Sequence, residues 1–267
     1  MRHRDVHSFL LGAANCFQSP SPRREGPLRF GVDLGTATIV LTAIDSNLRP
    51  VYWNFRPCEA VRDGVVVHFA EAVSAVRRLA GEAAQALGVE VGEAASAFPP
   101  GVAAAEARAC RYVLENAGVT CRRLVDEISA SEELLQISNG AIADVGGGST
   151  GVGVVENGEF VSLTDAPGGG HHLDLIVAGA LRISVAEAER RKRAGEAGLT
   201  SILRPGIERI ANSIGKQIAP RTVETVHLVG GAVRVPTAPE IIGRYLGQRT
   251  VGYAHSELVT PFGIAMS

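Results

Sequence analysis

Two short glycine-containing turns, each close behind an aspartate, place the strongest constraint on how this chain can fold. Residues 30–45 read FGVDLGTATIVLTAID and residues 142–155 read IADVGGGSTGVGVV. In both stretches an apolar run reaches an aspartate (Asp33 or Asp144), glycine and hydroxyl residues follow, and a second apolar run begins. Each stretch predicts a tight hairpin of two strands. Because the pattern occurs twice, it also indicates a duplicated architecture.

The segments around the two hairpins repeat one order of strands and helices, which predicts two similar α/β lobes and not one open sheet. Apolar periodicity predicts the main elements of the first half as strands 29–33 and 38–45 and helices 70–87 and 103–117. In the second half it predicts strands 142–146 and 150–156 and helices 173–182, 185–196 and 205–218. We expect an N-terminal helix and linker at 1–28, a first lobe at 29–143 plus 255–267, and a second lobe at 144–254.

The N-terminal segment has its own pattern. Residues 5–17 carry apolar side chains at helical spacing, and QSPSPRREGP follows as a proline-rich linker. We expect this helix to pack on the body of the protein; the alternative is a docking helix for a partner. Asp5, His7 and Ser8 interrupt its apolar patch, so a secretory signal is not predicted and a cytoplasmic location is expected.

Bulk composition excludes several classes of protein. The net charge of −2 gives no basic surface for nucleic acid, and no segment is long and apolar enough to predict a membrane span. The four cysteines form no CxxC pair, so we interpret them as thiols and not as a disulfide framework or a zinc site. His171 and His172 are adjacent on a predicted helix and would point to different faces, so we expect no metal site there.

Two common nucleotide-binding motifs are also excluded. A dinucleotide fold needs GxGxxG opening a helix, whereas both glycine stretches here lead into strand-like residues. No GKS or GKT sequence is present, so the chain has no Walker A loop.

The hairpins instead favour binding of phosphate groups. Glycine turns can present several backbone N–H groups to an anion, and glycine allows close backbone approach. Asp33 and Asp144 would repel phosphate directly but can hold it through hydrated Mg²⁺. A third glycine site, HLVGGAVRVP at 227–236, offers glycines against which a flat base can lie and Arg234, which can stack on it. The alternative for each hairpin is a tight turn capped by an acid.

DLGTAT, DVGGGST and LVGGAVRVP, in this order, resemble the two phosphate motifs and the adenosine motif of the actin, sugar-kinase and heat-shock ATPase superfamily. Within it, GVDLGTA, AVRDGVVV, FPPGVAAAEARACRYV, LLQISNGAIADVGGGSTG and TPFGIA resemble the EutJ-type ethanolamine utilization family over nearly the whole chain. The resemblance implies two ribonuclease-H-like lobes of the actin-like ATPase fold, in a minimal form without large insertions and with a nucleotide cleft between the lobes. It implies ATP and Mg²⁺ as cofactors.

The resemblance also implies roles for individual residues. Asp33 and Asp144 would hold Mg²⁺ through water, and with Glu127 they would position the attacking water. The phosphates would be faced by Gly35, Thr36, Ala37, Gly146, Gly147, Gly148, Ser149, Gly169 and Gly170. Glu189 and Lys192 would bind the ribose, and Gly230, Gly231 and Arg234 would sandwich adenine.

The sequence departs from the superfamily pattern in two places. Glu127 is followed by Ile-Ser-Ala-Ser where EPTAAA is usual. No lysine precedes Lys192, so only an arginine such as Arg62 could replace the first-lobe lysine of heat-shock members. These departures predict slow hydrolysis or a nucleotide-dependent switch.

Three functions follow from the resemblance. The first is an ATP-binding, ATP-hydrolysing chaperone or reactivation protein serving ethanolamine ammonia lyase or a bacterial microcompartment. The second is an assembly scaffold or filament protein of the division, cell-shape or type IV pilus kind (FtsA, MreB, PilM). The third is a small-molecule kinase, for which the sequence shows no clear catalytic base.

Overall fold

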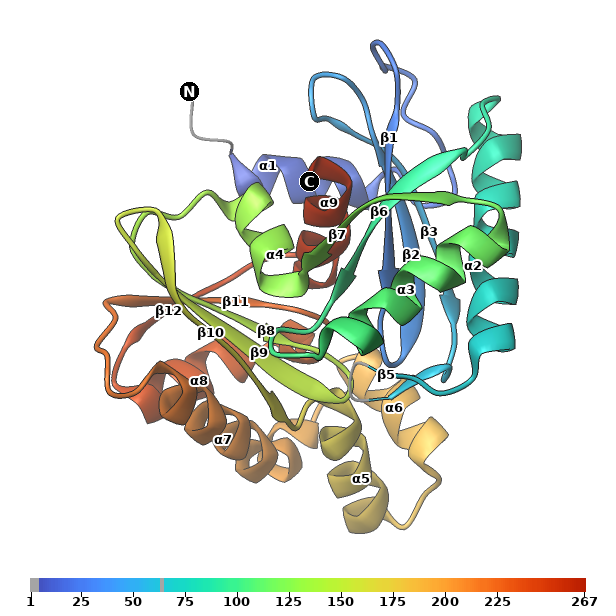
Figure 1. Cartoon of the computed structure of the whole chain (residues 1–267). Helices are drawn as coiled ribbons and strands as arrows, with labels where there is room; N and C mark the ends of the chain where they lie inside the picture. Colours follow the sequence, from blue (N-terminus) through green and yellow to red (C-terminus); the bar gives the residue numbers. More distant parts are fainter. Residues whose placement is uncertain (1–4, 63–64) are drawn as a thin grey trace. The chain divides into compact units, whose positions relative to one another are not determined.

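The computed structural model describes residues 5–62 and 65–267 (Figure 1). The chain divides into two compact units: unit 1 comprises Met1–Gln136 and Leu258–Ser267, and unit 2 comprises Ile137–Glu257.

Unit 1 is built on a five-stranded sheet of order β3-β2-β1-β6-β7. Its first three strands form an antiparallel meander, and β6 and β7 run parallel to β1. The strand bounds are β1 Arg29–Leu34, β2 Thr38–Ile44, β3 Pro50–Pro57, β6 Glu93–Phe98 and β7 Thr120–Asp126. A small separate pair, β4 (Val61–Arg62) and β5 (Val65–Val66), follows β3.

Helices cover both faces of this sheet (Figure 1). On one face, α2 (Phe69–Leu87) packs on β2 and β3, and α3 (Ala104–Ala117) packs on β6 and β7; they bury apolar side chains such as Val76 and Leu114. On the other face lie α4 (Glu127–Leu135) and α9 (Val259–Met266), which cross closely enough for Ser131 Oγ and Thr260 Oγ1 to lie 2.9 Å apart. The first β-hairpin is therefore held between two helical layers.

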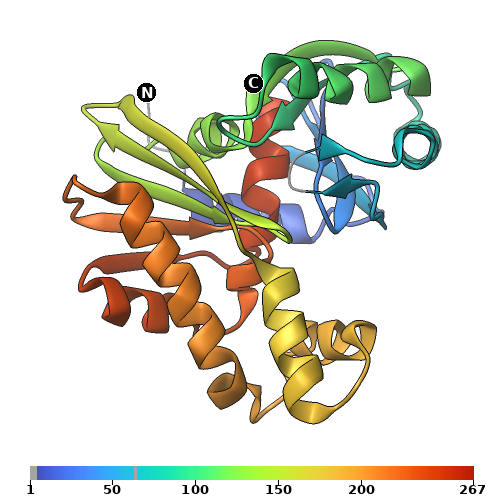
Figure 2. The ribbon, with the colours of Figure 1, turned by 60° about the horizontal axis from the view of Figure 1, so that its bottom comes forward.

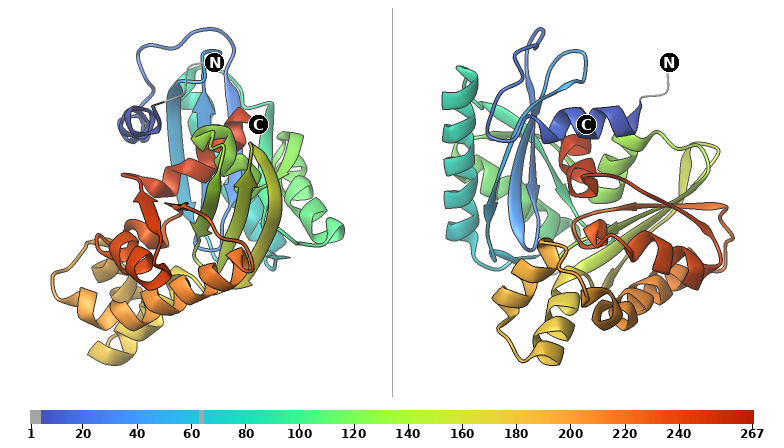
Figure 3. Two further views of the ribbon diagram at one scale, coloured as in Figure 1. Left: turned by 90° about the vertical axis from the view of Figure 1, so that its left-hand side faces the viewer. Right: turned by 180° about the vertical axis from the view of Figure 1, so that it is seen from behind.

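The N-terminal helix α1 (Val6–Ala14) packs within unit 1, beside α9 (Figure 3). Leu10 is fully buried, and the rings of Phe9 and Phe262 meet edge to face at 5.4 Å. Trp53 donates its indole N–H to the carbonyl of Ala13 at 2.9 Å. The expectation that this helix packs on the body is confirmed.

The linker after α1 lies along β3, the outer strand of the sheet. Trp53 N donates to Cys16 O at 3.1 Å, Gln18 N donates to Trp53 O at 2.9 Å, and Ser21 N donates to Val51 O at 2.8 Å. The ring of Phe17 lies against those of Trp53 and Phe55. Residues 16–21 thereby occupy backbone groups that an edge strand would otherwise expose.

Unit 2 repeats the plan with a second five-stranded sheet of order β10-β9-β8-β11-β12. The strands β8 (Gly140–Val145), β9 (Ser149–Glu156) and β10 (Glu159–Pro167) form an antiparallel meander, and β11 (Thr225–Val229) and β12 (Arg249–Gly252) add in parallel to β8. In both sheets the strands stand in the spatial order third, second, first, fourth, fifth. The prediction of two similar α/β lobes is confirmed.

The helices of unit 2 contribute apolar side chains to one core that they share with the sheet. Figure 2 shows the arrangement of these helices. They are α5 (Gly170–Leu181), α6 (Val185–Arg193), α7 (Leu199–Ile218) and α8 (Ala238–Leu246), with a short 3₁₀ turn, η1 (Ala232–Arg234), after β11. A second 3₁₀ turn, η2 (Ser256–Leu258), leads into α9. Among the described residues, no helix combines the length and apolar character needed to cross a bilayer.

The predicted start of one helix was wrong. Helix α7 begins at Leu199, with Pro205 inside it, and not at 205. Leu199 and Leu203 are buried on the same face as Ile207, and this burial outweighs the backbone hydrogen bond that proline cannot make. Helix α4 is capped by Asp126, whose carboxylate accepts from Ser129 N at 2.8 Å.

Candidate functional site

The second hairpin turn, Gly146–Gly148, is joined by its carbonyl groups to the segment before α5. Gly168 N donates to Gly148 O at 2.8 Å, Gly170 N to Gly146 O at 2.9 Å, and His171 N to Gly147 O at 2.9 Å. The first N–H groups of a helix lack acceptors within the helix. Here the carbonyl groups of the hairpin accept hydrogen bonds from two of these N–H groups, those of Gly170 and His171. The structure therefore brings together the glycines of 146–148 and Gly169-Gly170, which the sequence analysis had grouped only by resemblance.

At this junction glycine is required at position 169, because the backbones touch there. A Cβ at Gly169 would overlap Gly146 O, and one at Gly170 would lie 3.5 Å from Ala232 Cβ and 3.4 Å from Lys192 Nζ. Gly170 thus lies among the hairpin, the 3₁₀ turn η1 and helix α6. Ser149, the first residue of β9, accepts from Gly146 N at 3.0 Å through its carbonyl and closes the turn.

Asp144 lies near the carboxyl end of β8, beside the end of β11. The parallel register places it opposite Val229, and Gly230 follows directly. Gly230 has φ +91°, and a Cβ there would overlap Asp144 Oδ1 and come within 2.5 Å of Val145 O. The carboxyl ends of parallel strands are the usual location of ligand sites in α/β sheets.

Gly230 is also tied to the segment that leaves unit 2. Its N–H donates to Ser256 O at 3.1 Å, and the buried Ser256 hydroxyl donates to Gly230 O at 2.9 Å. Sequence reasoning missed Ser256, because nothing in HSELV distinguishes this serine from a surface residue.

Lys192 is the most enclosed basic group of the candidate site. Its side chain is 9% exposed, and Nζ lies 2.7 Å from Asp174 Oδ1, whose side chain is 7% exposed. Nζ also donates to Gly170 O at 2.8 Å. Burial raises the pKa of Asp174 above its ordinary value, and the hydrogen bond from Lys192 acts in the opposite direction. Sequence reasoning did not assign Asp174 to the site, although an acid four residues after Gly170 was a signal for it.

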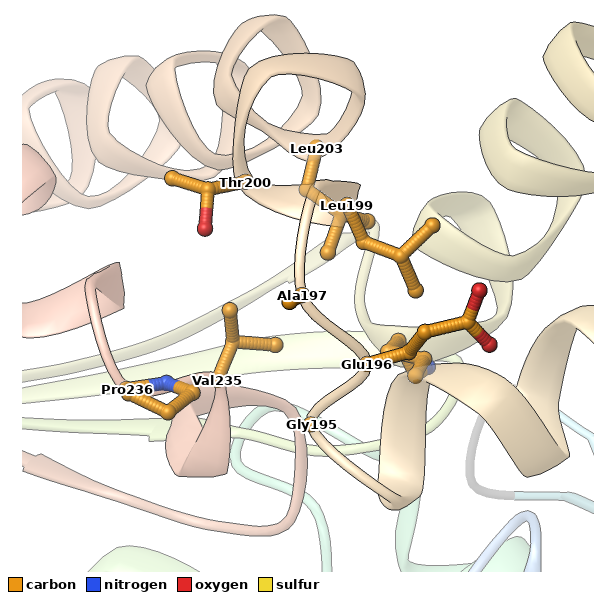
Figure 4. Close-up of a pocket in the computed structure, with 9 residues that line it drawn as sticks. Gly195, Glu196, Ala197, Leu199, Thr200, Leu203, Val235 and Pro236 are labelled. Atoms are coloured by element: carbon orange, nitrogen blue, oxygen red, sulfur yellow. The ribbon is translucent and has the colours of Figure 1, made fainter.

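A small pocket of about 80 Å³ lies beside Lys192 (Figure 4). Leu199, Thr200 and Leu203 at the start of α7 line it together with Gly195, Glu196 and Ala197, and Val235 and Pro236 lie across from them. Ligand pockets usually measure about 300–1,000 Å³. This pocket would therefore hold part of a small ligand, such as a flat ring, and not a whole nucleotide.

Two other predicted ligand residues are engaged in ion pairs. Arg234 Nη1 lies 3.2 Å from Glu257 Oε1, and the pocket is lined by the next two residues, Val235 and Pro236. Glu189 pairs with Arg193 one turn along α6, at 2.6 Å. Gly231 faces open space at its Cα.

Unit 1 contains the first predicted hairpin, with Asp33 and the turn that follows it. Asp33 is half-buried near the end of β1, and the turn Gly35–Ala37 connects to β2. A Cβ at Gly35 would lie 2.9 Å from Thr38 O. Thr36 is half-buried in the same turn, and Ala37 O accepts from Cys58 N at 3.2 Å. The Arg62 side chain lies outside the described residues.

Glu127 is the first residue of α4, directly after β7. Burial, followed by the negative charges of Glu127, Cys121 and Asp33, raises the pKa of the buried Cys110 thiol to about 12. Glu127 and Asp33 therefore both act on the Cys110 thiol. This agrees with their positions near the ends of β7 and β1, the two parallel strands that flank β6.

Two sheets of one strand order, each with a glycine hairpin and an acid near the end of its first strand, define a protein of the actin-like fold. Solved structures share this fold: the PilM–PilN type IV pilus biogenesis complex has a TM-score of 0.73 and 13% identity, covering 91% of this chain and 98% of that one. MreB5 of Spiroplasma citri bound to ADP has a TM-score of 0.70 and 14% identity, covering 88% and 94%.

Two further comparisons are much closer. The ethanolamine utilization protein EutJ of Salmonella typhimurium is 35% identical over 256 residues, 96% of this chain and 90% of the relative. The crystal structure of EutJ from Carboxydothermus hydrogenoformans has a TM-score of 0.94 and 35% identity, covering 98% of each chain. No family model matches the sequence. The chain belongs to the EutJ family of ethanolamine utilization proteins.

Proposed function

We propose that this protein binds Mg-ATP, hydrolyses it slowly, and uses the nucleotide to act as a chaperone or reactivation protein in ethanolamine utilization. One observation carries the proposal: Asp144, the 146–148 turn, Gly169-Gly170, Gly230 and the pocket beside Lys192 gather at the carboxyl ends of the strands of unit 2. An MreB5 structure of the same fold is bound to ADP.

The unit 2 site suits a nucleotide in two ways. Its pocket has apolar walls from Leu199, Leu203 and Val235, which suit a flat ring. The glycine turn next to it has its three carbonyl groups engaged by the 168–171 segment, which reduces their repulsion of an anion. We assign the base to the pocket, the phosphates to the turn, and Glu189, Gly231 and Arg234 to the rim around the sugar and base.

The carboxylates fit magnesium held through water. Where the chain is described, no three His, Cys, Asp or Glu side chains gather as direct ligands would. Mg²⁺ commonly keeps several waters and needs only one or two carboxylates besides phosphate oxygens. The backbone of Gly230 packs directly against the Asp144 carboxylate. We assign Mg²⁺, held through water, to Asp144 in unit 2; Asp33 is the equivalent acid of unit 1.

The catalytic contributions of this chain are then positioning and charge. When bound, the metal supplies charge neutralisation at the phosphates. In unit 2, Asp144 is the acid we assign to orienting the attacking water, and Ser149 lies at the end of the turn that faces the phosphates. In unit 1, Asp33 and Glu127 are the corresponding acids, and Gly35, Thr36 and Ala37 form the corresponding turn. No covalent step on the protein is needed.

Calorimetry of Mg-ATP binding tests the site. We expect the wild-type protein to bind, and Asp144→Ala to weaken binding by at least about tenfold, which is 1.4 kcal/mol. Glu240→Ala is the matched control, because Glu240 forms only an exposed ion pair with Arg244 on α8. A wild-type protein that binds no nucleotide, or equal affinities of wild type and Asp144→Ala, would overturn the proposal.

The client we propose is ethanolamine ammonia lyase or a microcompartment protein, met in the cytoplasm or at the microcompartment. The proposal draws on the name of the relatives, ethanolamine utilization protein. The test is size-exclusion chromatography of this protein mixed with its proposed client, run with ATP, with ADP and without nucleotide. Co-elution that depends on the nucleotide supports a chaperone cycle; separate elution in all three conditions contradicts it.

A second candidate is a nucleotide-dependent assembly scaffold, favoured by the shared fold of the PilM–PilN complex and MreB5. Light scattering separates the two candidates. An increase on addition of Mg-ATP, with reversal by chelation of Mg²⁺, supports the scaffold, whereas constant scattering together with nucleotide-dependent client binding supports the chaperone.

A further inference from the structure

The buried ion pair between Asp174 and Lys192 joins two helices beneath the candidate site. Asp174 comes from the first turns of α5, and Lys192 from the last turn of α6. Nζ lies 2.7 Å from Asp174 Oδ1, with both side chains less than a tenth exposed. The other ion pairs of α6 connect more exposed side chains, such as Arg190 and Arg193. A pair this enclosed must keep both partners to avoid leaving an uncompensated charge.

Lys192 also reaches the turn that faces the hairpin. Its Nζ donates to Gly170 O at 2.8 Å, and Gly170 N donates in turn to Gly146 O at 2.9 Å. The same lysine lines the pocket together with Val235 and Pro236. One side chain therefore contacts both the pocket and the segment that holds the glycine turn.

We infer that Asp174 is a positioning residue, which holds the Lys192 ammonium on the carbonyl of Gly170 so that this lysine orders the phosphate-side turn. The inference rests on the proposed function, since it assigns Lys192 to positioning and not to direct contact with a ribose. A ribose hydroxyl is a neutral partner, and an ammonium that turned to it would leave the Asp174 carboxylate buried without its counter-charge. The geometry thus favours the Asp174 carboxylate over a ribose hydroxyl as the partner of the Lys192 ammonium.

Asp174→Asn and Lys192→Gln separate the two roles, when titrated with adenosine, Mg-ADP and Mg-ATP in turn. We expect each variant to weaken the binding of Mg-ADP and Mg-ATP by about tenfold while adenosine affinity changes by less than about twofold. We expect the double variant to bind like either single variant, because both substitutions remove one interaction. Lys192→Arg, which keeps the charge, should recover part of the affinity.

Direct ribose contact predicts a different result. If Lys192 binds the sugar, Lys192→Gln weakens adenosine, Mg-ADP and Mg-ATP equally, and Asp174→Asn leaves all three unchanged or tighter. That pattern would overturn the inference. The control is Arg190→Gln, which removes an exposed ion pair on the same helix and should change none of the three affinities.

Amide hydrogen exchange provides a readout that needs no nucleotide. We expect the amides of residues 170–173 to exchange faster in Asp174→Asn and in Lys192→Gln, and at the wild-type rate in Arg190→Gln. If the wild-type protein binds no nucleotide but exchange changes in this way, the proposed function fails and the tie through Lys192 stands. Unchanged exchange in both variants would overturn the tie. Should Asp174→Asn fail to fold, the neutral pair of Asp174→Asn with Lys192→Gln replaces it.

Discussion

The backbone of Gly230 lies directly against the carboxylate of Asp144, without room for a side chain between them. Gly230 in turn exchanges two hydrogen bonds with Ser256. One continuous set of contacts thus joins Asp144, the candidate magnesium-binding acid, to Gly230 at the end of β11 and to Ser256 in the segment that leaves unit 2. Displacement of any of these three residues should therefore shift the other two.

Substitution of Gly230 should be costly. Gly230→Ala places a Cβ onto Asp144 Oδ1 at a residue with φ +91°, so we expect a loss of roughly 2–4 kcal/mol in the free energy of unfolding. Gly231→Ala is the matched control, since nothing lies within 4 Å of its added Cβ. We expect it to stay within about 0.5 kcal/mol of wild type. Urea denaturation of both variants decides, and equal stabilities would contradict the close packing.

The crossing of α4 and α9 in unit 1 gives a second glycine prediction. A Cβ at Gly263 would overlap the carbonyl of Ala130, so Gly263→Ala must push the helices apart, and we expect it to lower the free energy of unfolding by at least about 3 kcal/mol. Gly81→Ala in α2 meets open space and should raise stability by about 0.5–1 kcal/mol through helix propensity. Thermal melts of the two variants should therefore shift in opposite directions.

Helix α1 offers two adjacent leucines in opposite environments. Leu10 is fully buried, whereas Leu11 is 45% exposed. We expect Leu10→Ala to lower the free energy of unfolding by about 2–5 kcal/mol and Leu11→Ala by less than about 1 kcal/mol. If both variants match wild type in urea denaturation, α1 does not contribute to the core of unit 1. Deletion of residues 1–28 should likewise destabilise this unit.

His227 predicts a pH dependence of stability. Burial, with a smaller contribution from Arg249, lowers its pKa below 6.5, while its Nδ1 lies 2.6 Å from the hydroxyl of Tyr253. Below pH 6.5 the unfolded chain therefore gains a proton before the folded chain does. The stabilisation is complete above pH 6.5 and is lost as pH falls through the folded pKa. We expect His227→Gln to flatten this part of the curve of unfolding free energy between pH 5 and 8; parallel curves would contradict the assignment.

Cys110 reports on the two acids of unit 1. Its pKa of about 12 arises from burial and then from Glu127, Cys121 and Asp33. The native thiol should stay protonated at pH 8 and react with Ellman's reagent far more slowly than in the unfolded protein, where all four thiols are available. Asp33→Asn should lower this pKa and speed labelling of Cys110 at pH 10. Labelling unaffected by Asp33→Asn would show that this acid lies too far away to act on the thiol.

The hairpins and the lobe plan were predictable because their signals are local. A strand, a turn and a second strand are indicated within a few residues at Asp33-Leu-Gly and again at Asp144-Val-Gly-Gly-Gly. Strands that follow one another in sequence usually pair. The short strand β12 was missed, since four residues, two half-buried and two exposed, carry little periodicity. The start of α7 was predicted at Pro205, and not at Leu199, because proline is common at the first helical position.

The partners of the site's charged residues were not predictable in the same way. Lys192 meets Asp174, and Arg234 meets Glu257, only after separate elements have packed. The spacing of residues along AERRK or GGAVRVP contains no information on these contacts. Resemblance to a family supplies expected roles for such residues, whereas their actual neighbours depend on tertiary placement.

Residues 16–21 have a consequence for self-association. They are hydrogen-bonded along β3, so the outer strand of the first sheet already has a covering segment from its own chain. A second copy could pair with the Val51–Trp53 part of β3 only after this segment has left it, with loss of the contact between Phe17 and Trp53. Extension of the sheet by strand pairing along this part of β3 therefore requires a rearrangement of residues 16–21.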